Sequence, residues 1–248
     1  MSAGLIIVTG ASKGIGRQIS KRIVERGVKV LGIGRDSTEL TSLSNELGDD
    51  NFHFIAGDIA REDTVNRIFE FVSKNEFSLK GLVNNAGTIT PISKIANLDI
   101  NEVKSAFGTN LFSIIHLTTT LLPLILKYQG TIINVSSGAS TNPYTGWSSY
   151  CCTKAALNMF TMCLAKEHSG ILTLSIRPGV VDTGMQTLIR GGGKESMGQD
   201  FEKFITLKDS GKLLEPDVPA KVIARLAVEG FDSSLSGKFL SWDDSSLG

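Results

Sequence analysis

Cysteine and histidine are scarce in this chain, and its charges cancel. The 248 residues include only three cysteines and three histidines, and 25 lysines and arginines balance 25 aspartates and glutamates. An odd number of cysteines without a framework spacing favours a reducing compartment over a secreted disulfide scaffold. The scattered histidines suggest no zinc site, and zero net charge offers no basic field to nucleic acid or an acidic membrane. We therefore expect no metal, nucleic-acid or membrane partner.

The sequence also lacks a recognisable leader and a convincing membrane span. It opens with "MSAGLIIVTG", where a strand pattern begins almost at once, without a charged or long apolar segment before it. The most apolar region, residues 111–126, contains His116, Pro123 and several threonines, and its length also argues against a membrane-crossing helix. These features predict a cytoplasmic protein.

What the chain does contain is a regular alternation of apolar, strand-like runs and segments with helical periodicity. Apolar strands separated by helices predict a parallel sheet covered on both faces, and right-handed crossovers make the fold doubly wound, with ligands at the carboxyl ends of the strands. We therefore predict one α/β domain over residues 1–248, with a seven-stranded parallel sheet. The expected strands cover 5–9, 28–33, 52–56, 81–87, 130–137, 171–178 and 238–242, and the expected helices cover 15–26, 36–47, 62–74, 99–127, 149–168 and 217–229.

A glycine-rich segment, "TGASKGIG" (9–16), follows the first expected strand and opens the first helix. Gly10, Gly14 and Gly16 permit a tight turn and let the backbone approach a pyrophosphate, while the helix N-terminus supplies unpaired N–H groups and a partial positive charge. The spacing differs from the G-x-G-x-x-G fingerprint. Taken alone, this phosphate loop would also fit an ordinary strand-to-helix turn.

A second chemical signal lies in "SSYCCTKAALNMF" (148–160). Tyr150 and Lys154 are separated by about one helical turn, so their side chains share a face of the expected helix. An ammonium beside a phenol favours the phenolate and eases proton transfer. Because a tyrosine–lysine pair at this spacing is also common on helix surfaces, the pair alone does not indicate catalysis.

Four motifs appear in order along the chain: T-G-x-x-x-G-x-G at 9–16, N-N-A-G at 84–87, a serine ahead of Y-x-x-x-K, and P-G at 178–179. Together they make the chain resemble the classical short-chain dehydrogenase/reductase family. The resemblance implies a Rossmann-type domain, a nicotinamide cofactor, and hydride transfer on a carbonyl or an alcohol. The stretches "NPYTGWSSYCCTKAA" and "RPGVVDTGMQ" look most similar to sepiapterin reductases and yeast-type benzil reductases.

The family pattern implies the catalytic roles. By this resemblance, Tyr150 is the general acid in carbonyl reduction, and Lys154 lowers its pKa and holds the nicotinamide ribose. Ser137 would polarise the substrate carbonyl. Ser136 competes for this role, but the alternation along "INVSS" and the spacing to the tyrosine favour Ser137. Asn110 matches the family's asparagine that bends the long helix and anchors a proton-relay water.

The resemblance also implies a set of cofactor-binding residues. N-N-A-G would line the cofactor, and Asp58 would meet the adenine amine, unless it is only a charge at a helix N-terminus. Beyond P-G, Thr183 would reach the carboxamide or the phosphates. The expected cofactor-binding residues are Gly10, Ser12, Lys13, Gly14, Ile15, Gly16, Arg35, Asp58, Ile59, Asn85, Ala86, Gly87, Tyr150, Lys154, Pro178, Gly179, Val181 and Thr183.

The end of the second strand indicates which nicotinamide is used. NAD-preferring family members carry an acid there, whereas this chain has Gly34 followed by Arg35. Lys13 of the phosphate loop would converge with Arg35 on the adenosine ribose, where two cations suit a 2′-phosphate. Asp36 would begin the next helix, where an acid is a usual N-terminal residue. We therefore expect NADP(H).

The substrate is a small carbonyl compound by the same resemblance. Sepiapterin reductases carry an aspartate where this chain has Ser241, which disfavours pterin reduction and favours a ketone or a benzil-like α-dicarbonyl. Residues 184–215, an irregular region with glycines at 191–193, would form a lid over the site. The expected substrate residues are Ser137, Tyr144, Trp147, Met185 and Gln186, although Trp147 fits a packing role equally well.

A function without catalysis is the alternative from another class. Some family members are idle NADP-binding redox sensors or scaffolds, and these usually lose the tyrosine or the lysine. Both residues are present here. The sequence therefore favours an enzyme.

The long expected helix at 99–127 suggests a partner. One of its faces would cover the sheet, and the remaining apolar side chains would be left for another surface. In the family, this helix and the tyrosine helix commonly form a two-fold interface, so we expect a homodimer or homotetramer. The apolar residues are Phe107, Leu111, Ile114, Ile115, Leu117, Leu121 and Leu122.

Overall fold

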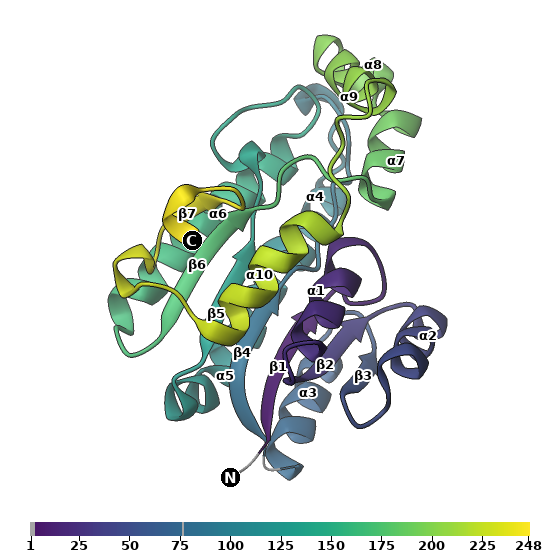
Figure 1. Ribbon diagram of the computed structural model, residues 1–248. Coiled ribbons are helices and arrows are strands. Elements are labelled where there is room, and N and C mark those ends of the chain that lie inside the picture. Colours follow the sequence, from purple (N-terminus) through teal and green to yellow (C-terminus); the bar gives the residue numbers. More distant parts are fainter. Residues whose placement is uncertain (1–2, 76) are drawn as a thin grey trace.

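Seven parallel strands form one sheet in the computed structural model, which describes residues 3–75 and 77–248 (Figure 1). The strand order is β3-β2-β1-β4-β5-β6-β7. The chain therefore starts in the middle of the sheet and builds outward on both sides, which is the predicted doubly wound topology. The strands are β1 (Gly4–Thr9), β2 (Lys29–Gly34), β3 (Phe52–Ala56), β4 (Ser78–Asn84), β5 (Thr131–Val135), β6 (Leu172–Arg177) and β7 (Phe239–Ser241).

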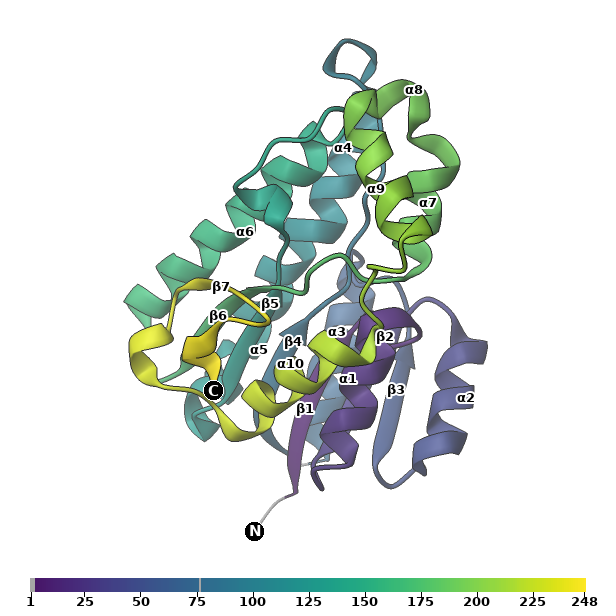
Figure 2. The ribbon, with the colours of Figure 1, turned by 45° about the horizontal axis from the view of Figure 1, so that its top comes forward.

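The strands are apolar throughout because helices cover both faces of the sheet. Successive side chains of a strand point to opposite faces, so Ile6 and Val8 of β1 join one core cluster and Leu5 and Ile7 join the other. The first cluster lies under α1 (Gly14–Val24), α2 (Ser37–Leu47) and α10 (Asp217–Glu229), and the second lies under α3 (Glu62–Lys74) and α5 (Ser113–Tyr128) (Figure 2). The helices around the sheet also include α6 (Ser148–Glu167).

The long helix expected at 99–127 is divided into three parts. α4 (Ile100–Phe107) leads into a π-helical turn (Gly108–Phe112), and α5 (Ser113–Tyr128) follows. Such turns often mark functional sites, and this one contains Asn110. Among the described residues, the combined stretch Ile100–Tyr128 is long and apolar enough to cross a membrane, but 44% of its apolar window is buried inside the protein. Since the core helix of a globular protein passes the same test, this is weak evidence for a span.

Burial corrects the expected surplus of apolar surface on this helix. Leu111 and Ile114 are buried against Leu157 of α6, and Leu117 and Leu121 belong to the core beneath the sheet. Much of the apolar surface counted toward a partner is therefore used within the fold. Several large apolar side chains of these helices are nevertheless exposed: Ile100 at 62%, Phe112 at 57%, Leu126 at 38%, Met159 at 57% and Met162 at 52%.

The glycines of the segment 184–215 predicted an irregular region. The segment is instead largely helical. It contains α7 (Gly184–Gly192), α8 (Lys194–Met197) and α9 (Gln199–Asp209), which lie at the top of Figure 1, beyond the end of the sheet. Phe201 and Phe204 of α9 are buried against Trp147 and its neighbours. Their spacing of three residues places both on one helix face. Burial of this face explains why the segment folds into helices despite its glycines.

Candidate active site

The tyrosine and the lysine of the sequence motif lie together on α6, as expected, and both are buried. Tyr150 is 7% exposed and Lys154 is 4% exposed. The Lys154 ammonium donates to the carbonyl oxygen of Val135 at 2.8 Å and lies 5.8 Å from the centre of the Tyr150 ring. Because Val135 ends β5, α6 presents the phenol and the ammonium at the carboxyl edge of the sheet.

Burial shifts both groups toward their neutral forms. It raises the pKa of Tyr150 to about 12, against the opposing effect of a hydrogen bond with Ser137, and it lowers the pKa of Lys154 to about 8. The expectation that Lys154 lowers the pKa of Tyr150 is therefore wrong for the protein by itself, because desolvation of the phenol dominates. At neutral pH the phenol keeps its proton while Lys154 stays mostly charged. This combination suits a proton donor supported by a cation.

Two serines follow β5, and their surroundings distinguish them. The hydroxyl of Ser137 is hydrogen-bonded with Tyr150 and accepts the backbone N–H of Ala139 at 3.1 Å. The hydroxyl of Ser136 is buried and has no hydrogen-bond partner among the residues described. Ser137 is thus the serine joined to the tyrosine, as the sequence spacing favours.

Asn110 lies beneath the site in the π-helical turn and is fully buried. Its side-chain oxygen accepts the backbone N–H of Thr88 at 2.7 Å, and its amide donates to the Thr88 carbonyl at 2.8 Å and to Thr153 Oγ1 at 3.2 Å. Thr153 Oγ1 in turn donates to the carbonyl of Tyr150 at 2.8 Å. Both amide protons of Asn110 are therefore used in holding the chain after N-N-A-G against the tyrosine helix. A relay water, as the resemblance implies, would need another group of this residue.

A cleft of about 1160 Å³ crosses the carboxyl ends of β1, β2 and β4. Gly10 turns the chain after β1 with a positive φ of 68°. At Gly16 a Cβ would overlap the carbonyl oxygen of Gly10 and lie 2.5 Å from Asn85 Nδ2. Asn85 Nδ2 also donates to the carbonyl of Thr9 at 2.9 Å. The phosphate loop is therefore closed tightly against N-N-A-G, and only glycine fits at position 16.

Most of the residues expected to bind the cofactor line this cleft. Gly16 is not among the residues that line it, and Gly179 and Val181 line a neighbouring cavity. That these three residues contact the cofactor stays a prediction. The cleft brings together Gly10, Ser12, Lys13, Gly14, Ile15, Arg35, Asp58, Ile59, Asn85, Ala86, Gly87, Tyr150, Lys154, Pro178 and Thr183.

The two expected cations, Lys13 and Arg35, line the end of the cleft beyond β2, together with Asp36 and Ser37. The Lys13 ammonium lies 3.7 Å from the Asp36 carboxylate, which also accepts the backbone N–H of Glu39 at 3.2 Å. Asp36 therefore caps α2, as expected for an acid at this place. Ser37 was not among the sequence candidates, although its position directly after Arg35 and Asp36 was the available signal.

Asp58 also lines the cleft, beside Ile59. Its carboxylate accepts the backbone N–H of Ala60 at 3.0 Å. The N-cap of α3 is Arg61 rather than Asp58. Asp58 therefore stabilises the turn after β3 and does not serve as the N-cap of α3.

A second cavity of about 660 Å³ adjoins the cleft, and Tyr150 lines both. Trp147 is central to its wall. Its ring centre lies 4.9 Å from that of Tyr144, 5.0 Å from that of Phe204, and 5.9 Å from that of Tyr150 in an edge-on arrangement. Trp147 is 4% exposed, so it packs in the core and faces the cavity at once. All expected substrate residues line this cavity: Ser137, Tyr144, Trp147, Met185 and Gln186.

Two residues of the cavity wall, Lys203 and Phe204, come from α9. The Lys203 ammonium donates to the hydroxyl of Tyr144 at 2.9 Å and lies 5.0 Å from the centre of its ring. The sequence patterns did not point to either residue, because this segment was expected to be irregular. The helical spacing of Phe201 and Phe204 was the signal that could have identified α9 as a wall of the site.

Comparison with known proteins agrees with this geometry. A family model described as short chain dehydrogenase matches residues 4–192. A benzil reductase ((S)-benzoin forming) from Saccharomyces cerevisiae is 39% identical over 256 residues, covering 98% of this chain and 97% of that protein. A solved short-chain dehydrogenase/reductase from Saccharomyces cerevisiae superposes with a TM-score of 0.96 at 34% identity, covering 99% of this chain and 98% of that one.

Solved relatives contain either nicotinamide cofactor. A serine dehydrogenase complexed with NADP+ is 25% identical, with a TM-score of 0.81 over 96% of this chain and 93% of that one. A 3-ketoacyl-(acyl-carrier-protein) reductase from Brucella melitensis complexed with NADH is 26% identical, with a TM-score of 0.82 over 97% and 96%. On the match to the family model and the identity to the yeast reductase, this chain belongs to the short-chain dehydrogenase/reductase family of NAD(P)H-binding oxidoreductases.

Proposed function

We propose that this protein is an NADPH-dependent carbonyl reductase that acts on a ketone or an α-dicarbonyl compound of the benzil type. The observation that carries the proposal is the position of Tyr150, which lines both the cleft and the aromatic cavity and is hydrogen-bonded with Ser137. A carbonyl oxygen in the cavity would accept a hydrogen bond from Ser137 and then a proton from Tyr150.

The cleft suits a nicotinamide dinucleotide in shape. At Gly87 a Cβ would lie 3.3 Å from Asn110 Oδ1 and 3.7 Å from Lys154 Nζ, so the missing side chain leaves room beside the ammonium. The N–H groups at the start of α1 would bind the pyrophosphate. When bound, the cofactor supplies the hydride. Lys154 would hold its ribose, and the walls at 85–87 would orient its ring toward the second cavity.

The preference for NADPH rests on charge at the far end of the cleft. Lys13 and Arg35 both line it, and Gly34 supplies no acid to accept the hydroxyls of an unphosphorylated ribose. In the turn between β2 and α2, Asp36 is the only acid among the described residues that line the cleft. Its carboxylate already caps α2. Two cations and a hydroxyl from Ser37 are suitable partners for a 2′-phosphate dianion.

Proton transfer follows from the two pKa values. The phenol of Tyr150, with a pKa of about 12, is protonated at neutral pH and donates its proton as the reduced substrate becomes an alkoxide. The phenolate that remains lies beside the Lys154 ammonium, and this charge lowers the energy of the transition state. Ser137 keeps the substrate oxygen and the phenol within reach of one another.

The chemistry of the second cavity supports an aromatic substrate. Flat rings pack well against a wall of Tyr144, Trp147 and Phe204. The yeast relative is named for reducing benzil, an aromatic α-dicarbonyl. We further propose that 184–215 serves as a lid, because α9 supplies part of this wall and is fastened to the loop before α6: the Asp200 carboxylate accepts the backbone N–H of Thr145 at 2.8 Å.

Two alternative functions make different demands on the same residues. A pterin reductase would need a carboxylate in the substrate cavity, and Asp243 lines it, two residues beyond Ser241. A thiol-based sensor would need a reactive cysteine near Tyr150, but burial raises the pKa of Cys151, which makes its thiolate scarce. A pterin should therefore be among the substrates tested, and the function as a thiol-based sensor is disfavoured.

The test is cofactor consumption by the purified protein with a panel of carbonyl compounds at fixed NADPH. The panel contains benzil, a smaller α-diketone, an aliphatic ketone and a pterin bearing a side-chain ketone. We expect benzil to be reduced fastest. The matched variant is Tyr150→Phe, which keeps the ring and its packing and loses only the proton. It should lose turnover and bind NADPH within severalfold of wild type in a fluorescence titration. Turnover retained in Tyr150→Phe, or no consumption with any carbonyl, would contradict the proposal.

A further inference from the structure

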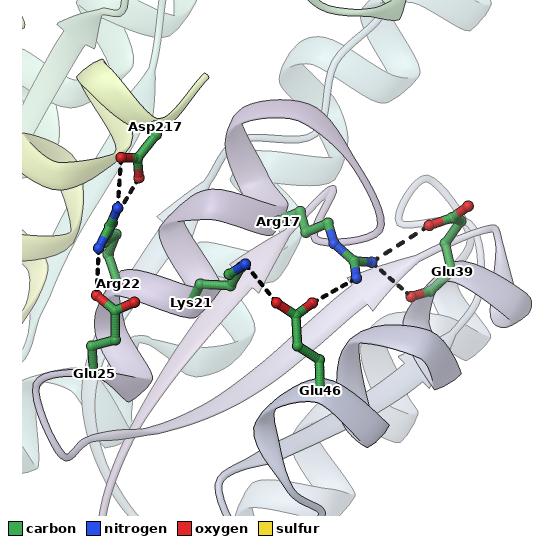
Figure 3. Close-up of polar contacts among 7 residues, drawn as sticks. All are labelled: Arg17, Lys21, Arg22, Glu25, Glu39, Glu46 and Asp217. Carbon is green, nitrogen blue, oxygen red and sulfur yellow. Dashed lines mark hydrogen bonds and ion pairs between the residues drawn. The ribbon is translucent and has the colours of Figure 1, made fainter. Parts of the chain in front are cut away.

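Charged side chains fasten α1, the helix after the phosphate loop, to a neighbour on each side (Figure 3). On one side, Arg22 forms a two-pronged pair with Asp217 of α10, with both nitrogen–oxygen distances at 2.6 Å. On the other side, Arg17 reaches Glu46 of α2 at 2.8 Å, and Lys21 pairs with the same carboxylate. The two sides differ in what they hold, because only α2 begins beside the cleft.

Arg17 also contacts the first turn of α2. One of its guanidinium nitrogens lies 3.2 Å from the Glu39 carbonyl oxygen and 3.4 Å from the Glu39 carboxylate. The backbone N–H of Glu39 donates in turn to the Asp36 carboxylate. The Arg17 side chain is 19% exposed, so these contacts are partly sheltered from water. One planar guanidinium therefore spans α2 from its first turn to its last, as Figure 3 shows.

The chain that leads into α2 carries Arg35, one of the two cations of the cleft. Arg35 and Asp36 line the cleft directly before α2, and Lys13 faces them from the phosphate loop. The backbone N–H of Arg17 donates to the carbonyl of Lys13 at 3.4 Å. Arg17 is not among the described residues that line the cleft. Its charge is thus not placed to bind a ligand there, but its contacts connect the two segments from which Lys13 and Arg35 extend.

We infer that Arg17 is a positioning residue for recognition of the 2′-phosphate, which presupposes the proposed use of NADPH. By holding the first turn of α2 against α1, it keeps Arg35 at a fixed distance from Lys13, so that both cations meet one phosphate. Without it, the turn after β2 moves independently of the phosphate loop, and the two charge-assisted bonds are not made together. NADH has no 2′-phosphate, so its affinity does not depend on this arrangement.

Three variants of the full chain test the inference through dissociation constants for NADPH, NADH and adenosine 2′,5′-bisphosphate. Arg17→Met removes the guanidinium, and Arg17→Lys keeps the charge but cannot bridge Glu39 and Glu46 together. Arg22→Met is the matched control, because it removes the same charge from the same helix on the α10 side. We expect Arg17→Met to weaken NADPH and the bisphosphate by roughly three- to tenfold, the equivalent of losing part of one charge-assisted hydrogen bond. NADH should bind as in wild type, Arg17→Lys should retain most of the defect, and Arg22→Met should lower the melting temperature without changing the NADPH-to-NADH ratio.

Two outcomes for Arg17→Met would overturn the inference and leave the proposed use of NADPH intact. One is an equal loss of NADPH and NADH affinity in Arg17→Met, and the other is no loss of affinity for either cofactor; Arg17 would then only stabilise the fold. The inference would also be wrong if Arg17→Lys had the wild-type NADPH affinity, or if Arg22→Met changed the NADPH-to-NADH ratio as Arg17→Met does. The positive charge of α1 would then act on the phosphate at long range, and the contacts of Arg17 would not matter. If the wild-type protein binds NADPH no more tightly than NADH, the proposed cofactor fails, and the inference fails with it.

Discussion

Lys154→Met should show how much the burial of this lysine costs the stability of the fold. Burial lowers the pKa of Lys154 from 10.5 to about 8, which at about 1.4 kcal/mol per pH unit corresponds to about 3 kcal/mol at neutral pH. Methionine removes this penalty but leaves the carbonyl of Val135 without its donor, a loss of about 1–3 kcal/mol. The two effects nearly cancel at neutral pH. The dependence on pH is therefore the informative quantity.

The sign of that dependence follows from proton binding. Below the folded pKa of about 8, both the folded and the unfolded chain hold the proton of Lys154, and the penalty is fully present. Between about 8 and 10.5 the folded protein releases it while the unfolded chain keeps it, so the free energy of unfolding rises with pH. Methionine has no such slope. The stability of wild type minus that of the variant should therefore increase by about 2–3 kcal/mol from pH 7 to pH 10.

The assay is urea unfolding without cofactor, at one protein concentration, for wild type and variant between pH 7 and pH 10. The lost Val135 hydrogen bond does not vary with pH and drops out of the comparison. Lys166→Met is the control, because Lys166 is an exposed lysine on the same helix. Its difference curve should be flat. A flat curve for Lys154→Met as well would refute the reasoning, since burial would then not depress the pKa of this ammonium.

Three further predictions address the cofactor, the loop and the assembly. Arg35→Ala should weaken NADPH by roughly ten- to a hundredfold, the value of a charge-assisted pair, and leave NADH unchanged; equal losses in competition titrations would make the arginine structural. The reverse experiment, Gly34→Asp, is less clean than the sequence suggests, because a Cβ there would lie 3.2 Å from Ser12 Oγ. Gly16→Ala should abolish measurable binding of either dinucleotide and lower the free energy of unfolding by roughly 1–3 kcal/mol, because the new methyl overlaps the Gly10 carbonyl. Gly170→Ala, whose Cβ would meet nothing within 4 Å, is its control and should behave as wild type in the same titration and unfolding curve. Finally, light scattering should show a homodimer or homotetramer, and Met159→Glu on the exposed face of α6 should reduce it to a 26.6 kDa species; a wild-type monomer at micromolar concentration would exclude the interface.

Much of the fold could be predicted because its signals are local. The apolar runs that became β1 to β6 are separated by segments of helical period, and this alternation admits few architectures besides a parallel sheet. The site motifs are also local signals. The glycines at 10, 14 and 16 lie within one short segment, and the spacing of Tyr150 and Lys154 alone places them on one helix face. The order of the motifs along the chain was then enough to predict which residues form the site.

The segment 184–215 shows where local signals mislead. Three consecutive glycines predict irregular structure, yet the segment forms α7, α8 and α9. Glycine disfavours a helix by about 1 kcal/mol per residue, and burial of an aromatic side chain such as Phe204 outweighs this. The burial exists only because Trp147, far away in sequence, supplies the opposite surface. No window of the sequence contains both partners.

Tertiary structure alone decided the electrostatics of the site. The sequence places Tyr150 and Lys154 side by side and so suggests that the cation lowers the pKa of the phenol. The fold buries both, and desolvation reverses the direction for the tyrosine. Which backbone groups hold Asn110 also depends on a segment that is distant in the chain, because both belong to Thr88. The sequence determined which groups are present and on which elements they lie, because spacing and periodicity are properties of neighbours. Dielectric environment and hydrogen-bond partners are properties of the space between elements, and only the packed fold creates that space.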